Sequence, residues 1–529
     1  MSRADSEADF DGGHARPGLP SDGVARQFLA CLAAGGLLIL PIILFVHRYI
    51  DDYGRSMDGS YYWLQVGRPL AEGLFGLVNL GAPSVAVAPL HQLLAVSVLA
   101  LTAVIAARAY GLRSPLWTPL ATLPLIGQPY GLENLSYGFD SFFMATALSL
   151  AVVAAVLVHR LPTRLGLLMS ALMLLGCFCL YQPATSAFLA FALMLVLAEV
   201  LGLSAGVPEA PSVQGRIGRV FGTYGLSLLG YALLWNMVLL DRTFYAAEQG
   251  QRLPIGPDLP ARLLDNSLEL WRVILDDWQR WPVVFPCLLL VLSYALVVWM
   301  AVGRLSLRNR RPLARFGRWS LVILAVAVIG LVSPGAMLGL KDPLARVPRI
   351  QMFLGPLLSS MTLQIVAAVT TVRRTTRRGL LAAVPLVGLV TFAWLLVVFA
   401  YAYGHAYAAQ SIYEQGRISR LTDGISRLQA QLPSAGITTI GFRGTMPMSP
   451  VLQNSQEKFP LLGRLVPRLI DNDWSWGPKQ VQFHGLPLLR RPMGVGDFSE
   501  GPCIPSSTSA CTAEYSLRVR GSHLLVRLE

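Results

Sequence analysis

Two adjacent carboxylates, Asp51 and Asp52, open the stretch of the sequence whose residue types could do chemistry. They follow an apolar run, 28–46, that is long enough to cross a bilayer as a helix, so both acids would lie where lipid gives way to water. Neighbouring carboxylates bind protons with unequal affinity, so one becomes the better base and the other the better partner for a cation such as Arg55. The pair therefore could supply a catalytic base; the alternative is an ordinary acidic flank of a membrane helix.

The segment after these acids, 59–78, combines Arg68, several aromatic residues and an apolar face. This composition is typical of a segment that lies along a membrane surface rather than crossing the membrane. Tyrosine and tryptophan are common at that depth, so anchoring is favoured over stacking on a sugar.

The elements that must position these residues are membrane helices. Of the 529 residues, 54% are hydrophobic and only 14% are charged, far below the roughly one quarter charged that is usual in soluble domains. The net charge of +13 is carried mostly by arginines between apolar runs, and no basic patch interleaved with aromatics indicates a nucleic-acid partner. The composition predicts an α-helical polytopic membrane protein.

Apolar runs near 20 residues predict about eleven transmembrane helices. We expect them near 28–46, 85–107, 115–129, 141–158, 165–180, 184–203, 220–240, 282–302, 319–338, 352–371 and 379–403. The third is short and rich in proline, so it could be broken or partly re-entrant.

Arginine-rich connections all fall on one side of this predicted topology, and the positive-inside rule makes that side cytoplasmic. They contain Arg108 and Arg113, Arg160 and Arg164, Arg216 and Arg219, Arg304 to Arg318, and Arg373 to Arg378. Residues 1–24 are then a disordered cytoplasmic tail, and 25–404 form the transmembrane domain. The loops 47–84, 130–140, 241–281 and 339–351 and a C-terminal domain, 405–529, face the periplasm of a bacterial inner membrane.

Charged residues gather at these outward ends rather than within the helices. Glu133 and Asp140 lie in the second outward loop, while Lys341, Arg346 and Arg349 lie in the last one. Cations on an outer loop run against the positive-inside rule and call for an anionic partner, either a lipid headgroup or a bound phosphate. The scarcity of charges near the midplane argues against an ion-coupled transporter.

The C-terminal tail reads as a small mixed α/β domain. An apolar face repeats over 418–432 with helical spacing, and 436–442 and 515–520 have the pattern of strands. Cys503 and Cys511 are close together in this tail, and an oxidising periplasm favours a disulfide between them. The other four cysteines lie in apolar runs. The acidic and aromatic run 471–476 is more typical of a simple loop than of a glycan contact.

Three separated motifs resemble one family. The sequence Asp51-Asp52-Tyr53-Gly54-Arg55-Ser56, followed by 67–70, then 133–141 with Met144, and then Tyr181-Gln182 is similar to the type II O-antigen glucosyltransferases of the Gtr group. The similarity runs from about residue 25 to 405. The group belongs to the GT-C class of membrane glycosyltransferases, in which a polyprenyl phosphate carries the sugar, here expected to be glucose, to a glycan at the outer face. Gly138 departs from the pattern, because a basic residue is usual there, and the tail carries no matching motif.

The resemblance implies that Asp51 is the base, because the base of such enzymes is the first acid of the first-loop motif, with Asp52 as its competitor. If the helical turn continues, its spacing places Arg55 to pair with Asp51. It implies substrate contacts from the remaining motif residues Arg68, Glu133, Asn134, Tyr137, Asp140, Tyr181 and Gln182.

The chemistry fits that reading. A phosphate leaving group is already a stable anion, so transfer with inversion needs one base and some cations but no general acid. Lys341, Arg346 or Arg349 would hold the phosphate, and no cluster of metal ligands is apparent, so we expect no cofactor and a metal-independent reaction. The expected partners are a polyprenyl-phosphate sugar, an O-antigen or other polysaccharide acceptor and membrane lipid. The alternatives are a lipid-linked glycan polymerase, a flippase or other transporter, and a non-catalytic membrane scaffold.

Overall fold

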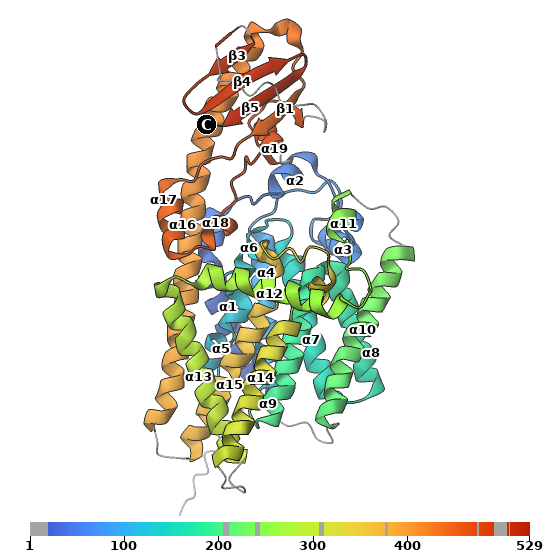
Figure 1. Cartoon of the computed structure of the whole chain (residues 1–529), viewed down its shortest axis with the longest axis vertical. Coiled ribbons are helices and arrows are strands. Elements are labelled where there is room, and N and C mark those ends of the chain that lie inside the picture. Colours follow the sequence, from blue (N-terminus) through green and yellow to red (C-terminus); the bar gives the residue numbers. More distant parts are fainter. Residues whose placement is uncertain are drawn as a thin grey trace, which may run out of the picture.

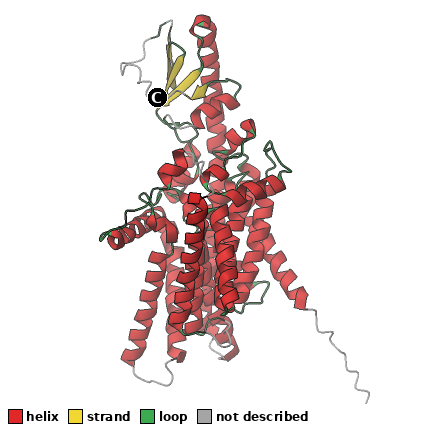
Figure 2. Ribbon diagram, turned by 90° about the vertical axis from the view of Figure 1, so that its right-hand side faces the viewer, coloured by secondary structure: helices red, strands yellow, loops and turns green. Residues whose placement is uncertain are grey.

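The computed structural model describes residues 20–204, 211–237, 244–305, 312–375, 379–472, 476–490, 505–506 and 508–528. Within these ranges the chain is mostly helical and ends in a five-stranded sheet. Long helices form a bundle, and the sheet stands beyond one end of that bundle (Figures 1 and 2).

Every predicted transmembrane run overlaps a helix. These helices are α1 (Pro20–Phe45), α4 (Leu90–Ala109), α5 (Trp117–Gly127), α7 (Ser141–Arg160), α8 (Arg164–Leu180), α9 (Ser186–Val200), α10 (Val213–Met237), α13 (Trp281–Leu305), α14 (Pro312–Val332), α15 (Leu354–Thr375) and α16 (Gly379–Gln431). In the described part of the chain, seven helical segments are long and apolar enough to cross a membrane, while α8, α14 and α15 provide shorter apolar stretches. The multi-pass helical architecture is confirmed, and the count of eleven spans stays a prediction.

Small side chains bring the bundle helices close together. Ala100 and Ala107 of α4 and Ala147 and Ala154 of α7 are fully buried, and the two helices pack against each other. In lipid, helices associate mainly through such close van der Waals packing and through polar links between helices. Thr102 Oγ1 supplies one of these links by donating to Ser149 of α7 over 2.7 Å.

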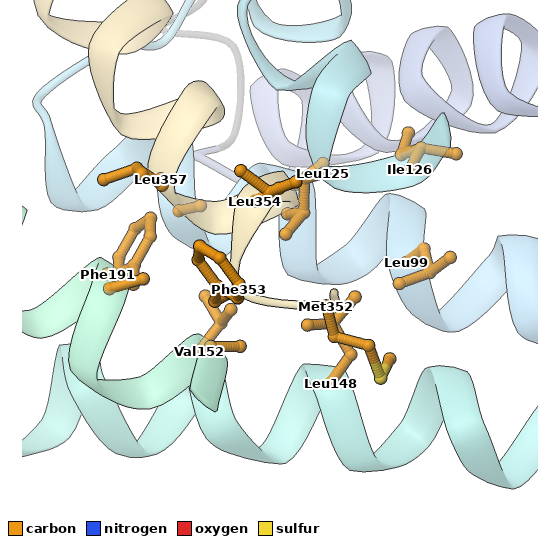
Figure 3. Packing of buried hydrophobic residues seen from close by; sticks show 14 of the residues in the cluster. Leu99, Leu125, Ile126, Leu148, Val152, Phe191, Met352, Phe353, Leu354 and Leu357 are labelled. Atoms are coloured by element: carbon orange, nitrogen blue, oxygen red, sulfur yellow. The ribbon is translucent and has the colours of Figure 1, made fainter. Parts of the chain in front are cut away.

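Larger side chains fill the space where α4, α5, α7 and α9 meet the start of α15. Figure 3 shows Leu99, Leu148 and Phe191 converging on Met352 and Phe353. Both of the latter residues are buried. They lie just after the turn that carries Arg349, so packing of the core fixes the position of that turn.

The basic connections meet at the end of the bundle away from the sheet. Arg108 Nε of α4 donates to Gln27 Oε1 of α1 over 3.0 Å, and Arg219 Nη2 of α10 donates to the carbonyl of Leu161 over 2.7 Å. Arg216 of α10 pairs with Glu199 of α9. Three of the five predicted basic connections therefore lie at this end, as expected, whereas residues 306–311 and 376–378 of the other two lie outside the described residues.

The predicted outward loops lie at the same end as the sheet (Figure 1). They contain α2 (Asp52–Asp58), η1 (Leu64–Val66), α3 (Pro69–Val78), α6 (Gly131–Ser136), α11 (Phe244–Gln249), α12 (Leu259–Trp278), η3 (Gly335–Gly339) and η4 (Pro348–Ile350). Helix α12 runs across the end of the bundle, and α2 and α6 lie between the bundle and the sheet.

The C-terminal domain is built on the far half of α16. Its strands are β1 (Thr439–Arg443), β2 (Leu489–Arg490), β3 (Ser509–Cys511), β4 (Tyr515–Arg520) and β5 (His523–Leu528). They form a mixed sheet in the order β2-β1-β5-β4-β3, in which β1 is parallel to both neighbours and the other pairs are antiparallel. The predicted mixed α/β domain and its two strands are confirmed.

The predicted apolar face of the tail helix packs on this sheet. Ile418, Leu421, Ile425 and Leu428 are buried in one cluster with the sheet residues Ile440, Phe442, Leu517, Leu524 and Val526. Helix α16 runs without interruption from the bundle through residue 404, where the sequence had suggested a boundary. Three short helices, α17 (Pro450–Lys458), α18 (Leu462–Leu465) and α19 (Trp476–Phe483), follow β1.

Candidate active site

Asp51 and Asp52 point into different surroundings although they are neighbours in the chain. Asp51 is the residue that precedes α2, and Asp52 is the first residue of the helix. Successive helical residues project about 100° apart, so one of the two can face the protein while the other faces outward. Asp52 is 1% exposed, whereas Asp51 is exposed.

The buried carboxylate of Asp52 joins the first outward loop to the second. Its Oδ2 accepts from the backbone N–H of Tyr49 over 2.9 Å and from that of Gly138 over 2.8 Å. Burial raises the pKa of Asp52 to about 7, against the lowering effect of the two N–H groups. Its Oδ1 is buried and makes no hydrogen bond within the described residues. Asp52 is therefore placed to hold two loops together.

Gly138 leaves room for this link. A Cβ added there would meet Asp52 Oδ2 at 3.2 Å and the Cβ of Ala88 at 3.4 Å. A side chain at this position would begin against the Asp52 carboxylate, so glycine at residue 138 gives Asp52 the room that it needs.

Arg55 pairs with Asp140 of the second loop rather than with Asp51. The Arg55–Asp140 ion pair is almost buried, and Trp63 Nε1 donates to the second oxygen, Asp140 Oδ1, over 2.6 Å. The Arg55 guanidinium also lies 4.3 Å from the centre of the Trp63 ring. The expected Arg55–Asp51 pair is corrected here, because Asp140 is the buried carboxylate on that face and Asp51 lies outside it. Burial alone lowers the pKa of Arg55, but Asp140, Asp51 and Asp52 raise it above its ordinary value.

A second ion pair joins the buried Glu133 of α6 to the partly buried Arg349 of η4. Arg349 Nη1 lies 2.9 Å from Glu133 Oε1, and the backbone N–H of Arg349 donates to Oε2 over 2.6 Å. Burial raises the pKa of Glu133, although Arg349 lowers it. Tyr137 and Asn134 complete the cluster: the same guanidinium donates to the Tyr137 hydroxyl over 2.7 Å, and the Asn134 amide lies 3.4 Å from the Arg349 carbonyl.

The third arginine, Arg68, contacts uncharged side chains. Its Nε donates to Gln182 Oε1 over 3.1 Å, and its guanidinium lies 4.7 Å from the centre of the Tyr181 ring. Gln182 in turn donates to the carbonyl of Gly67 over 3.2 Å and to the Tyr231 hydroxyl over 2.8 Å. Tyr181 links this group to the previous cluster, because its hydroxyl lies 3.5 Å from the Arg349 carbonyl.

Gly67 makes the turn before Arg68 possible. Its φ is +78°, in the left-handed region that glycine tolerates best. An added Cβ would lie 1.9 Å from Trp235 Cζ3 and 2.4 Å from the Tyr231 hydroxyl oxygen. The tight turn at Gly67 thus places Arg68 next to Tyr181 and Gln182.

Lys341 and Arg346 have surroundings different from that of Arg349. Lys341 is exposed and its Nζ lies 3.4 Å from Gln251 Oε1. Arg346 is exposed too, and its carbonyl accepts from Arg464 Nη1 over 3.0 Å. Arg464 also pairs with Asp277 of α12, which accepts from the Tyr130 hydroxyl over 2.7 Å. Of the three cations expected to hold a phosphate, Arg349 is the one that contacts Glu133 and Tyr137.

Helix α19 of the C-terminal domain lies against α2, which sequence reasoning missed. Trp476 Nε1 donates to Asp51 Oδ1 over 3.1 Å, and Lys479 Nζ lies 2.9 Å from Asp58 Oδ2. Phe483 packs edge-on against Tyr53, with ring centres 5.3 Å apart. These three residues of α19 recur at intervals of three and four, which places them on one face of the helix. That spacing is visible in the sequence, but the identity of the partner helix is not.

The outward end of the bundle thus holds one exposed carboxylate, Asp51, and three arginines, two of which are paired with buried acids. Among the residues that the structure describes, no three His, Cys, Asp or Glu side chains come together as they would around a metal ion. Metal independence stays an expectation.

Of the predicted disulfide, Cys503 lies outside the described residues, and Cys511 is disulfide-bonded. Cys31, Cys177, Cys179 and Cys287 are free.

Comparison with known proteins gives a family match. The model of the family described as "Glucosyl transferase GtrII" matches residues 40–360, which is more than half of the chain and includes Asp51, Arg68 and Arg349. A protein of Salmonella phage P22, described as an uncharacterized 55.3 kDa protein in the gtrB 5' region, is 24% identical over 457 residues. That alignment covers 84% of this chain and 88% of the phage protein. No solved structure matches.

Proposed function

The chain belongs to the Glucosyl transferase GtrII family, and we propose that it moves glucose from a polyprenyl phosphate carrier to O-antigen or a similar surface polysaccharide. The proposed site is the sheet end of the bundle, which would face the periplasm of a bacterial inner membrane. Two features support this placement: the arginine-rich connections gather at the opposite end, and positive charge favours the cytoplasmic side.

The observation that carries the proposal is the contrast between Asp51 and the other acids of the site. Asp52, Glu133 and Asp140 are all at most 2% exposed. Glu133 and Asp140 are held by arginines, and Asp52 is held by backbone N–H groups. Asp51 is exposed at the end of the first membrane helix, where a lipid-borne donor and a water-borne glycan can both arrive. A general base must reach the proton that it takes, so Asp51 is the acid best placed for that role.

The reaction is then a single displacement. Asp51 accepts the proton of an acceptor hydroxyl, and the hydroxyl oxygen attacks the anomeric carbon as the bond from that carbon to the phosphate oxygen breaks. The bonding electrons leave with the polyprenyl phosphate, so the anomeric configuration inverts. Because the leaving group is already an anion, cations that stabilise it replace a general acid.

Arg68 is the side chain that we assign to the carrier phosphate. Arg55 and Arg349 already pair with carboxylates, whereas the Arg68 contacts described above are to an amide oxygen and a tyrosine ring. A guanidinium with neutral neighbours can add a charge-assisted bond to phosphate without giving up an existing ion pair. Lys341 and Arg346, which are exposed, stay candidates for the same anion or for lipid headgroups.

The test is transfer of labelled glucose from polyprenyl phosphate glucose to O-antigen by the full-length protein in membranes. Asp51→Asn keeps the size of the side chain but removes its basicity, so turnover should fall by at least about a hundredfold while protein level is unchanged. Asp58→Asn on the same helix is the matched control and should stay within about twofold of wild type. Wild-type turnover in the Asp51→Asn protein would overturn the assignment of the base, and no transfer by the wild-type protein would overturn the proposed reaction.

A further inference from the structure

The C-terminal domain lies outside the matched region of the family, yet one of its side chains contacts the proposed base. Trp476 comes 425 residues after Asp51 and donates its indole N–H to Asp51 Oδ1 over 3.1 Å. Tryptophan has a donor and no acceptor, so in this contact the indole donates and the Asp51 oxygen accepts.

The side chain of Asp51 does not cap the helix that it precedes. An aspartate in this position commonly accepts from a backbone N–H of the first turn, but Asp51 makes no such bond to α2. Oδ1 instead receives the Trp476 N–H. The second oxygen, Oδ2, is thereby turned to a defined direction relative to α2.

The helix that carries Trp476 makes two further contacts around α2. The Lys479–Asp58 ion pair lies about two turns along α2 from Asp51, and Phe483 packs between Tyr53 and the guanidinium of Arg48, which lies 4.8 Å from the ring centre. The three contacts use one face of α19 and cover most of the length of α2. The Trp476 bond is therefore part of a docked interface.

We infer that Trp476 is a positioning residue through which the C-terminal domain orients Asp51 toward the acceptor hydroxyl. This inference rests on the proposed function, because it takes Asp51 to be the base. It gives the C-terminal domain a part in the chemical step, with Oδ2 facing the incoming hydroxyl and Oδ1 held by the indole.

Two aromatic substitutions separate the hydrogen bond from the packing. Trp476→Phe keeps a ring but removes the donor, whereas Trp476→His restores an N–H four bonds from Cα, as in tryptophan. If orientation of Asp51 matters, Trp476→Phe should lower kcat about tenfold with little change in the KM for polyprenyl phosphate glucose. Trp476→His should recover most of that loss.

Lys479→Met supplies the matched control, because it removes an exposed ion pair from the same interface without touching Asp51. Such pairs contribute little, so kcat should stay within about twofold of wild type. Each variant is measured as full-length protein in membranes, with O-antigen purified from an isogenic strain that lacks the gene.

The outcomes distinguish this inference from the proposed function. Loss of turnover in Asp51→Asn together with wild-type kcat in Trp476→Phe overturns the positioning role and leaves the base assigned. Equal losses in Trp476→Phe and Trp476→His also overturn it, because packing would then explain both. Wild-type turnover in Asp51→Asn would overturn the assignment of Asp51 as the base, whatever the Trp476 variants show.

Discussion

The carboxylate of Asp52 and the backbone N–H of Gly138 meet over 2.8 Å, so that a single buried acid ties together two loops that are 86 residues apart in the chain. The same oxygen accepts from Tyr49. This relationship separates Asp52 from Asp51 in the structure: Asp52 is buried and joins two loops, and Asp51 is exposed.

Replacing Asp52 by asparagine should change the pH dependence of stability. Burial raises the pKa of Asp52 to about 7, so between about pH 4 and pH 7 the folded protein holds a proton that the unfolded chain releases. The stability due to the protonated acid is therefore complete below about pH 4 and lost as the pH rises to about 7. A shift of this size corresponds to at most about 4 kcal/mol. Asp52→Asn is neutral throughout and can still accept both N–H bonds, so its stability relative to wild type should rise from pH 5 to pH 8.

Thermal unfolding of detergent-solubilised protein, followed by tryptophan fluorescence at several pH values, measures this difference. Asp58→Asn, at a partly exposed site, is the control and should give no comparable trend. Parallel pH profiles for wild type and Asp52→Asn would contradict the prediction.

Removing Arg349 should destabilise the protein more than removing its whole ion pair. Arg349→Met leaves the carboxylate of Glu133 buried without its cation, which commonly costs about 3–5 kcal/mol. Glu133→Gln combined with Arg349→Met removes the uncompensated charge and should recover much of the loss. A double-mutant cycle of unfolding midpoints tests this coupling, with exposed Arg346→Met as the control. Additive effects of the two single changes would show that the pair is not coupled.

Arg68→Ala should weaken use of the donor rather than of the acceptor. Loss of one charge-assisted phosphate contact should raise the KM for polyprenyl phosphate glucose about tenfold, equivalent to about 1.4 kcal/mol. Arg68→Lys should recover part of the effect because it keeps the charge but not the planar fork. Initial rates with donor and acceptor varied separately give both constants. If Lys341→Ala or Arg346→Ala raises the donor KM while Arg68→Ala does not, the phosphate site lies at the last outward loop.

Cys503 and Cys511 should be linked in protein isolated from the membrane. Cys511 ends β3, at the edge of the sheet. A disulfide there would reduce the number of conformations open to the unfolded tail and so stabilise the domain by about 2–3 kcal/mol. Peptide mapping without reductant should recover the joined pair. Alkylation of both thiols before any reduction would reject the bond and the oxidising location with it.

The sequence was informative where the signal is local. Apolar runs predicted the helices of the bundle, and the spacing of Ile418, Leu421, Ile425 and Leu428 predicted the face of α16 that packs on the sheet. Two strands were visible for the same reason. Each of these signals lies within one element, so neighbouring residues suffice to detect it.

Partners that are distant in the chain could not be predicted in this way. The partner of Arg55 is Asp140, 85 residues later, although helical spacing pointed to Asp51. The contact of Trp476 with Asp51 spans 425 residues, and a single acidic and aromatic run gives no indication of it. The different burial of Asp51 and Asp52 depends on where the Gly138 backbone lies, which is a property of tertiary packing.

Helix α16 fixes how the C-terminal sheet is rotated about the helix axis relative to the membrane bundle. Its 53 residues span about 80 Å as one continuous helix, much more than the roughly 30 Å of a bilayer core. Deleting one residue from the stretch between the bundle and the sheet would turn the domain by about 100° and swing α19 off α2, whereas deleting seven would shorten the helix by about 10 Å and turn the domain only about 20°. In relatives that bring Trp476 to Asp51 in the same way, the length of this stretch should therefore differ by whole pairs of turns. The outward loops between the bundle and the sheet should then differ in height by a matching amount.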